Sequence, residues 1–234
     1  MSFKKKILPR KQGTKVLHFL SAAFTDYIAA RVLLNSGLLL QGAVLASTSL
    51  EKYLKAIMAL HGNESRGHLK KAHWNALKNH STALYEKLNQ AFLQLCQKCY
   101  RLRYTDKLPL DFNLVIAQFE FLTELDHSVS LIENSIKTVD QGRNQIRAYQ
   151  AAVECKDQRL YANNIAVQKL QRVDIDKGFA QMVYEVRNCR QRGLIELHYG
   201  TISNPIREGF LREGCVTKDG YSYTTAFEYK PSAG

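Results

Sequence analysis

The stretch LLLQGAVLASTSLEKYLKAIMALHG, residues 38–62, carries the clearest helical pattern in the chain. Its apolar residues recur at steps of three and four, which places their side chains on one face of an α-helix. They are Ala43, Ala46, Leu50, Leu54, Ile57 and Leu60. The pattern ends at His61-Gly62, and glycine is common just after a helix C-terminus. We expect the polar residues Ser49, Glu51, Lys52 and Lys55 to point mostly outward.

Three further segments show the same periodicity, over residues 17–34, 84–102 and 112–136. In the first, Arg31 is the one charged member of the apolar face, and Asn35-Ser36-Gly37 supplies a stop. Long helices with one apolar face become stable by packing those faces together. The four segments therefore predict an antiparallel four-helix bundle.

The pattern changes after Gly142. Residues 143–198 still favour helices, although their apolar faces are weaker. Asp219-Gly220 is a typical hairpin turn, and the aromatic residues of 221–229 alternate with smaller or polar ones. We predict an all-α fold: a helical bundle in residues 1–140 and a helical extension in residues 141–234. The extension packs on the bundle and ends in a small β-hairpin.

The positive charge lies mostly in the N-terminal half of the chain. The whole chain has a net charge of +12, and residues 1–110 carry 18 Lys and Arg against 5 Asp and Glu. An excess of this kind favours an anionic partner, which could be RNA, a nucleotide or an acidic protein. A solvated, lysine-rich surface explains the same charge equally well.

The cysteines and the N-terminal segment indicate the cellular compartment of the protein. The chain has five cysteines, an odd number, which favours unpaired thiols in a reducing compartment. Asp26 and Arg31 interrupt the apolar run of residues 16–46, and no cleavage site follows it. We therefore expect neither a signal peptide nor a membrane span, and a cytoplasmic protein without a membrane partner.

Several motifs occur in a recognisable order. Tyr27 precedes the segment Leu50-Glu51-Lys52-Tyr53-Leu54-Lys55-Ala56, which is followed by Gly62 and by His68-Leu69. The stretch RLRYTDKLPLDF, residues 101–112, contains Arg-Tyr-x-Asp. Over about residues 15–140 the chain resembles the HEPN domain family. The resemblance implies a helical bundle that forms a homodimer, with the helix of residues 38–62 near the interface, and a nucleotide or RNA as ligand.

Many HEPN proteins are metal-independent ribonucleases with an Arg, four to six further residues and a His. Here Arg192 and His198 have this spacing and Tyr199 follows, but Gly193 stands where the family prefers a polar residue. Such a His could take the proton of a ribose 2′-hydroxyl while the guanidinium stabilises the phosphoryl oxygens. On this hypothesis Arg192 and His198 are the catalytic residues. The binding residues are Arg187, Asn188, Arg190 and Tyr199.

Other interpretations remain open. The Arg and His residues of 186–200 also fit the basic, solvent-facing end of a helix. Cys96 and Cys99 have metal-ligand spacing but fit core packing, and we expect surface and capping roles for His61, His68, His73 and His80. We predict no metal and no cofactor. RNA or nucleotide binding is favoured over two alternatives: a toxin-like endoribonuclease with an antitoxin-like partner, and a helical module that binds an acidic protein.

Overall fold

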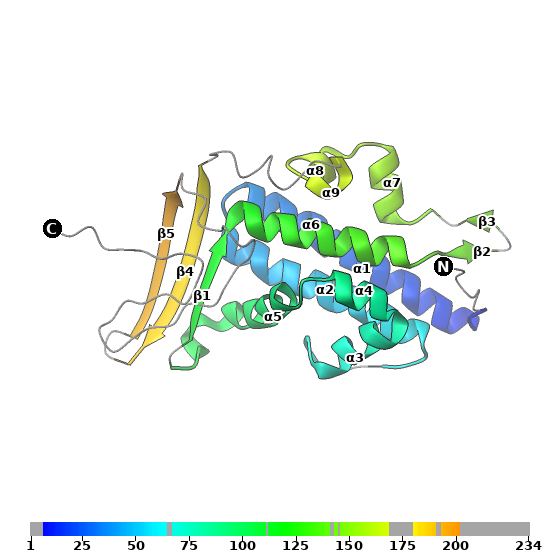
Figure 1. Ribbon diagram of the computed structural model, residues 1–234, viewed down its shortest axis with the longest axis horizontal. Coiled ribbons are helices and arrows are strands. Elements are labelled where there is room, and N and C mark those ends of the chain that lie inside the picture. Colours follow the sequence, from blue (N-terminus) through cyan, green and yellow to red (C-terminus); the bar gives the residue numbers. More distant parts are fainter. Residues whose placement is uncertain are drawn as a thin grey trace.

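The structure, a computed structural model, describes residues 7–64, 67–110, 112–140, 143–144, 146–168, 180–190 and 193–201. The described chain is mostly helical, with a small antiparallel sheet at one end (Figure 1). The predicted hairpin of residues 214–229 lies outside the described residues. The division of the chain at residue 140 stays a prediction.

Helices α1 (Arg10–Asn35) and α2 (Leu39–Leu60) pack side by side, and α6 (Gln118–Ser135) lies along them (Figure 1). Gly42 permits close approach of α1 and α2, because a Cβ atom built there would lie 2.6 Å from Leu34 Cγ. By length and apolar composition α1 could cross a membrane. However, Leu20, Ala23 and Leu34 are buried in the core, as in a core helix of a globular protein.

The segment after α2 forms shorter helices than the periodicity predicts. They are α3 (Lys71–His80), α4 (Thr82–Lys87), α5 (Gln90–Cys99) and the 3₁₀ helix η1 (Tyr100–Lys107). The helix predicted over residues 84–102 is interrupted because Asn89 begins a new one: its side chain accepts a hydrogen bond from the Phe92 backbone N–H at 3.4 Å. Cys96 and Cys99 are buried, as predicted.

The predicted fourth helix is wrong in its first part. Residues Asn113–Ala117 form strand β1 instead, and the helix, α6, begins only at Gln118. Val115 fits the helical spacing, but every residue of β1 is buried on one face of the sheet or the other. A short apolar run of this kind is compatible with both a buried strand and a helix.

The prediction of helices up to residue 198 is also wrong in part. Short helices α7 (Ala148–Glu154), α8 (Gln158–Tyr161) and α9 (Ile165–Gln168) do occur, after a two-residue pairing of β2 (Val139–Asp140) with β3 (Arg143–Asn144). Strands β4 (Gln181–Cys189) and β5 (Gly193–Thr201) then complete the sheet in the order β1-β4-β5, all antiparallel. The fold is therefore not all-α.

A buried ion pair joins residues 159–164 to the long helices. Arg31 and Asp126 form an ion pair with both side chains fully buried, and Tyr27 Oη donates a hydrogen bond to Asp126 at 2.7 Å. The Arg31 guanidinium also donates to the backbone carbonyls of Arg159 and Ala162. The charged exception in the first apolar stripe is thus the residue that holds this part of the chain in place.

Candidate nucleic-acid interface

The stretch that contains the predicted Arg–His motif forms a β-hairpin and not a helix. Arg192 lies outside the described residues. His198 lies on β5, is exposed, and its ring contacts that of Tyr184 with centroids 4.7 Å apart. Tyr184 is the residue opposite His198 on β4. The structure therefore places His198 on the sheet, and the Arg192–His198 pair stays a prediction.

The predicted binding residues lie on two faces of the sheet. Because side chains alternate along a strand, Arg187 and Tyr199 share one face, whereas Asn188 and His198 share the other. Arg187 is buried and forms an ion pair with Glu185 at 2.5 Å, and Tyr199 Oη donates to Glu185 at 2.7 Å. The ion pair lies within β4, and the Tyr199 hydrogen bond joins β5 to β4.

Two other predicted binding residues lie near the end of β4. Asn188 donates its side-chain N–H to the Leu108 carbonyl at 2.6 Å, which fixes β4 against the segment after η1. Arg190 lies in the exposed turn. The described part of the hairpin therefore does not gather the predicted residues in one place.

A different group of side chains does converge, on the middle of α2. Glu51 was expected to point outward but is buried, because Lys55 and His68 both contact its carboxylate. The Lys55 Nζ–Glu51 Oε1 distance is 2.5 Å, and the His68 Nδ1–Glu51 Oε2 distance is 3.0 Å. Ser49 is buried as well and donates to the Ala23 carbonyl at 2.8 Å.

His68 is held by an aromatic ring as well as by Glu51. Its imidazole stacks on the ring of Tyr100, the first residue of η1, with centroids 3.3 Å apart and planes inclined by 24°. The Gln97 side chain donates to the Leu69 carbonyl at 2.9 Å and fixes the adjacent backbone. The His68 side chain nevertheless remains 48% exposed. An exposed imidazole is thus held in one orientation by three elements of the fold.

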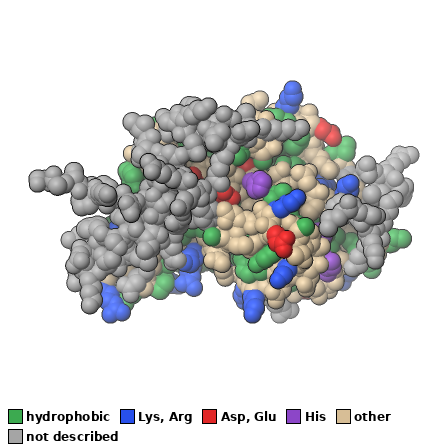
Figure 2. Space-filling view, viewed as in Figure 1, with side chains coloured by type: hydrophobic (Ala, Val, Ile, Leu, Met, Phe, Trp, Pro, Cys, Tyr) green, Lys and Arg blue, Asp and Glu red, His purple; other side chains and the backbone are tan. Residues whose placement is uncertain are grey.

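Helix η1 and the end of α5 present a basic and aromatic surface next to His68. We call it the η1 surface and define it by its half-buried or exposed side chains: Lys98, Tyr100, Arg101, Arg103, Tyr104 and Lys107. Arg103 lies over the ring of Tyr100, at 5.2 Å from its centroid, and Lys107 Nζ lies 5.6 Å from that of Tyr104. Figure 2 shows several Lys and Arg side chains along the lower edge of this view, with others elsewhere on the same face.

The sequence contained a signal for this surface. Residues 97–107, QKCYRLRYTDK, hold four cationic residues, two tyrosines and a single acidic residue, Asp106. They overlap the Arg-Tyr-x-Asp element but were not predicted to bind. The contact between Tyr100 and His68 joins segments that no local pattern relates.

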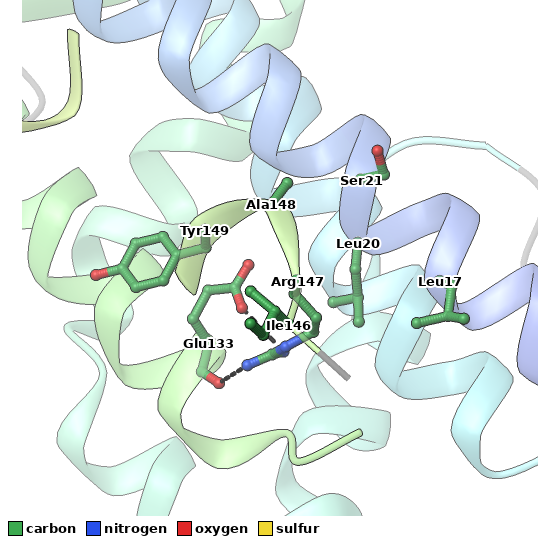
Figure 3. A pocket seen from close by; sticks show the side chains of 8 residues that line it. All are labelled: Leu17, Leu20, Ser21, Glu133, Ile146, Arg147, Ala148 and Tyr149. Carbon is green, nitrogen blue, oxygen red and sulfur yellow. Dashed lines mark hydrogen bonds and ion pairs between the residues drawn. The ribbon is translucent and has the colours of Figure 1, made fainter. Parts of the chain in front are cut away.

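The structure also contains a small cavity of about 170 Å³ between α1 and residues 146–149 (Figure 3). Arg147 forms an ion pair with Glu133 at 2.9 Å beside it, and Tyr53 donates to the same carboxylate at 2.8 Å. Burial raises the pKa of Glu133. Because the two charges neutralise each other, we assign this cluster a structural role: it joins α7 to α6.

Within the described ranges, no group of three or more His, Cys, Asp and Glu side chains could hold a metal ion. Burial raises the pKa of both Cys96 and Cys99, so neither thiol is activated. No protein-family model, curated protein or solved structure matches the chain.

Proposed function

We propose that this protein binds single-stranded RNA on the η1 surface, and that it is a HEPN-type protein that forms a cytoplasmic homodimer. The observation that carries the proposal is the η1 surface itself. Four cationic side chains and two tyrosines come together there, beside a histidine that is held in place. Some of the residues on which the HEPN resemblance rests lie at or next to this surface: Glu51, Lys55, His68 and the Arg-Tyr-x-Asp element.

The charges fit a phosphate backbone. Guanidinium groups bind phosphate oxygens through two parallel hydrogen bonds, and Arg101 and Arg103 are both exposed. Single-stranded RNA releases its bound counterions when cationic side chains of a protein replace them, so the binding weakens steeply as the salt concentration rises.

The tyrosines favour RNA over an acidic protein as the partner. Tyr104 is 51% exposed, so its ring is accessible to an unpaired base. Exposed rings beside cations are the arrangement by which proteins stack unpaired bases, at about 1–3 kcal/mol per base.

The test is fluorescence anisotropy of a labelled single-stranded RNA at several salt concentrations, in a metal chelator. If all four cations contact phosphates, the slope of log K against log salt is about −2.8. The variant Arg101→Gln/Arg103→Gln should bind more weakly and lose about 1.4 of that slope. Tyr104→Ala should cost about 1–3 kcal/mol, and Tyr104→Phe should restore it because the ring is kept.

The matched control is Arg10→Gln/Lys11→Gln, which removes the same charge from exposed positions at the start of α1. Figure 1 shows the start of α1 at the opposite end of the helices from the sheet. The proposal fails if this control weakens binding as much as the η1 variant, since net charge alone would then explain the affinity. It also fails if an acidic peptide, but not RNA, binds.

A second candidate function is metal-independent cleavage of the bound RNA, and the His68–Glu51 pair favours it. The carboxylate on Nδ1 leaves Nε2 as the basic nitrogen of an exposed imidazole. Nε2 could take the 2′-hydroxyl proton as the 2′-oxygen attacks the phosphorus, while Arg103 stabilises the phosphoryl oxygens. The P–O5′ bond breaks, and the leaving 5′-oxygen takes a proton from water. His68→Asn should abolish cleavage and keep RNA binding. If His198→Asn abolishes it instead, the Arg192–His198 hypothesis is favoured.

A further inference from the structure

Two histidine rings meet where α2 and α3 end. His61 directly follows the last residue of α2, and His80 is the last residue of α3. His61 Nε2 lies 3.3 Å from His80 Nδ1, and the two ring planes are inclined by 71°. The two rings come from helices that are separate in sequence.

The distance between the two nitrogens suits two ligands of one metal ion. The two nitrogens form a hydrogen bond at 3.3 Å, which is at the long end of the range for a bond donated by N–H. Zinc binds histidine nitrogen at about 2.0–2.1 Å in a tetrahedral arrangement, which puts two such ligands about 3.3–3.4 Å apart. The observed separation equals the edge of that tetrahedron.

The local charge also favours a cation. The C-terminus of a helix carries a partial negative charge, and two helices, α2 and α3, end at this point.

We propose that His61 and His80 together bind a divalent transition-metal cation that prefers imidazole ligands, such as Zn²⁺, with water in the remaining positions. The ion joins the end of α2 to the end of α3. It thereby restrains the intervening segment, which contains His68 and its contacts with Glu51 and Tyr100. Two protein ligands make a weaker site than the four of a structural zinc centre.

The test is isothermal titration of untagged protein with zinc chloride, together with thermal unfolding at each zinc concentration. Because Cys155 is exposed and a thiolate binds zinc, all variants carry Cys155→Ser. The Cys155→Ser protein should have a zinc site that raises Tm. His61→Asn and His80→Asn should each lose that site and the rise in Tm. The matched control is His127→Asn, which removes an exposed histidine of α6 and should keep both.

Circular dichroism before titration checks that each variant is folded. The proposal is overturned if the Cys155→Ser protein takes up no zinc, or if His61→Asn and His80→Asn bind it as the Cys155→Ser protein does. Loss of the site in His127→Asn as well would place the metal elsewhere and would also overturn it.

Discussion

Breaking the Arg31–Asp126 pair should destabilise the protein more than any surface change. Both side chains are fully buried, and Asp126→Ala leaves the Arg31 guanidinium without its counter-charge. Burial, the largest effect on Asp126, raises its pKa, which reflects the cost of keeping a charge in this place. Removing one member of a buried pair costs about 3–5 kcal/mol.

Urea unfolding followed by circular dichroism measures this cost. With a slope of about 3 kcal/mol per molar, a loss of 3–5 kcal/mol lowers the midpoint by about 1–1.7 M. The matched control is Glu64→Ala, because the Lys15–Glu64 pair has side chains that are 41% and 75% exposed. Removing such a surface pair should cost about 0–1 kcal/mol.

The double variant Arg31→Met/Asp126→Ala separates the charge from the packing. It no longer buries an unpaired charge, so it should be less destabilised than the sum of the two single variants. It should not recover fully, because the Arg159 and Ala162 carbonyls lose their donor. A cost of less than about 1 kcal/mol for Asp126→Ala, or additive single variants, would refute this explanation.

Three further predictions concern stability. Burial lowers the pKa of His73, so the unfolded chain binds a proton there more readily than the folded protein does. The free energy of unfolding should therefore fall as the pH drops below about 6.5. His73→Gln should reduce this pH dependence when urea unfolding at pH 7 is compared with that at pH 5.5. Gly42→Ala should destabilise the protein by about 1–3 kcal/mol, because the new Cβ would lie 2.6 Å from Leu34 Cγ. Replacing glycine by alanine usually stabilises a helix, so a rise in Tm would contradict the close packing of α1 on α2. Tyr199→Phe should cost about 1–2 kcal/mol in chemical unfolding, since buried Glu185 loses a donor, and no change would mean that the bond is unimportant.

The two long N-terminal helices could be predicted because their periodicity agrees with their packing. The segments 17–34 and 43–60 fall within α1 and α2, and most of their stripe positions are buried, whereas Leu17, Phe24 and Leu60 are half-buried. Arg31 was visible as an exception, but its partner Asp126 lies 95 residues away. A contact over that separation leaves no local pattern.

Strands β1 and β4 could not be predicted from periodicity because they are buried on both faces, whereas β5 is mostly exposed. In β4 the five residues 183–187 are all buried, so the alternation that identifies a strand is absent. Glu185 and Arg187 also interrupt the apolar run, since an ion pair lets them lie inside. A helical interpretation of this stretch was therefore the natural one, and it was wrong.

Only single residues of the candidate site, and not their contacts, could be identified from the sequence. Glu51, Lys55 and His68 were noted as motif residues, but the sequence offered no reason to bury Glu51. The reason lies in the contacts: Lys55 and His68 neutralise the carboxylate, and Tyr100 holds the imidazole from another element. Charge and aromatic content could have singled out residues 97–107, whereas the role of His68 needs the fold.

Photocrosslinking of a single-stranded RNA to the protein, with mass spectrometry of the linked peptides, locates the bound RNA. We predict crosslinks to Tyr100 or Tyr104, and their loss in Arg101→Gln/Arg103→Gln but not in Arg10→Gln/Lys11→Gln. Crosslinks confined to the β4–β5 hairpin, with none in residues 97–107, would contradict it and place the RNA on the sheet.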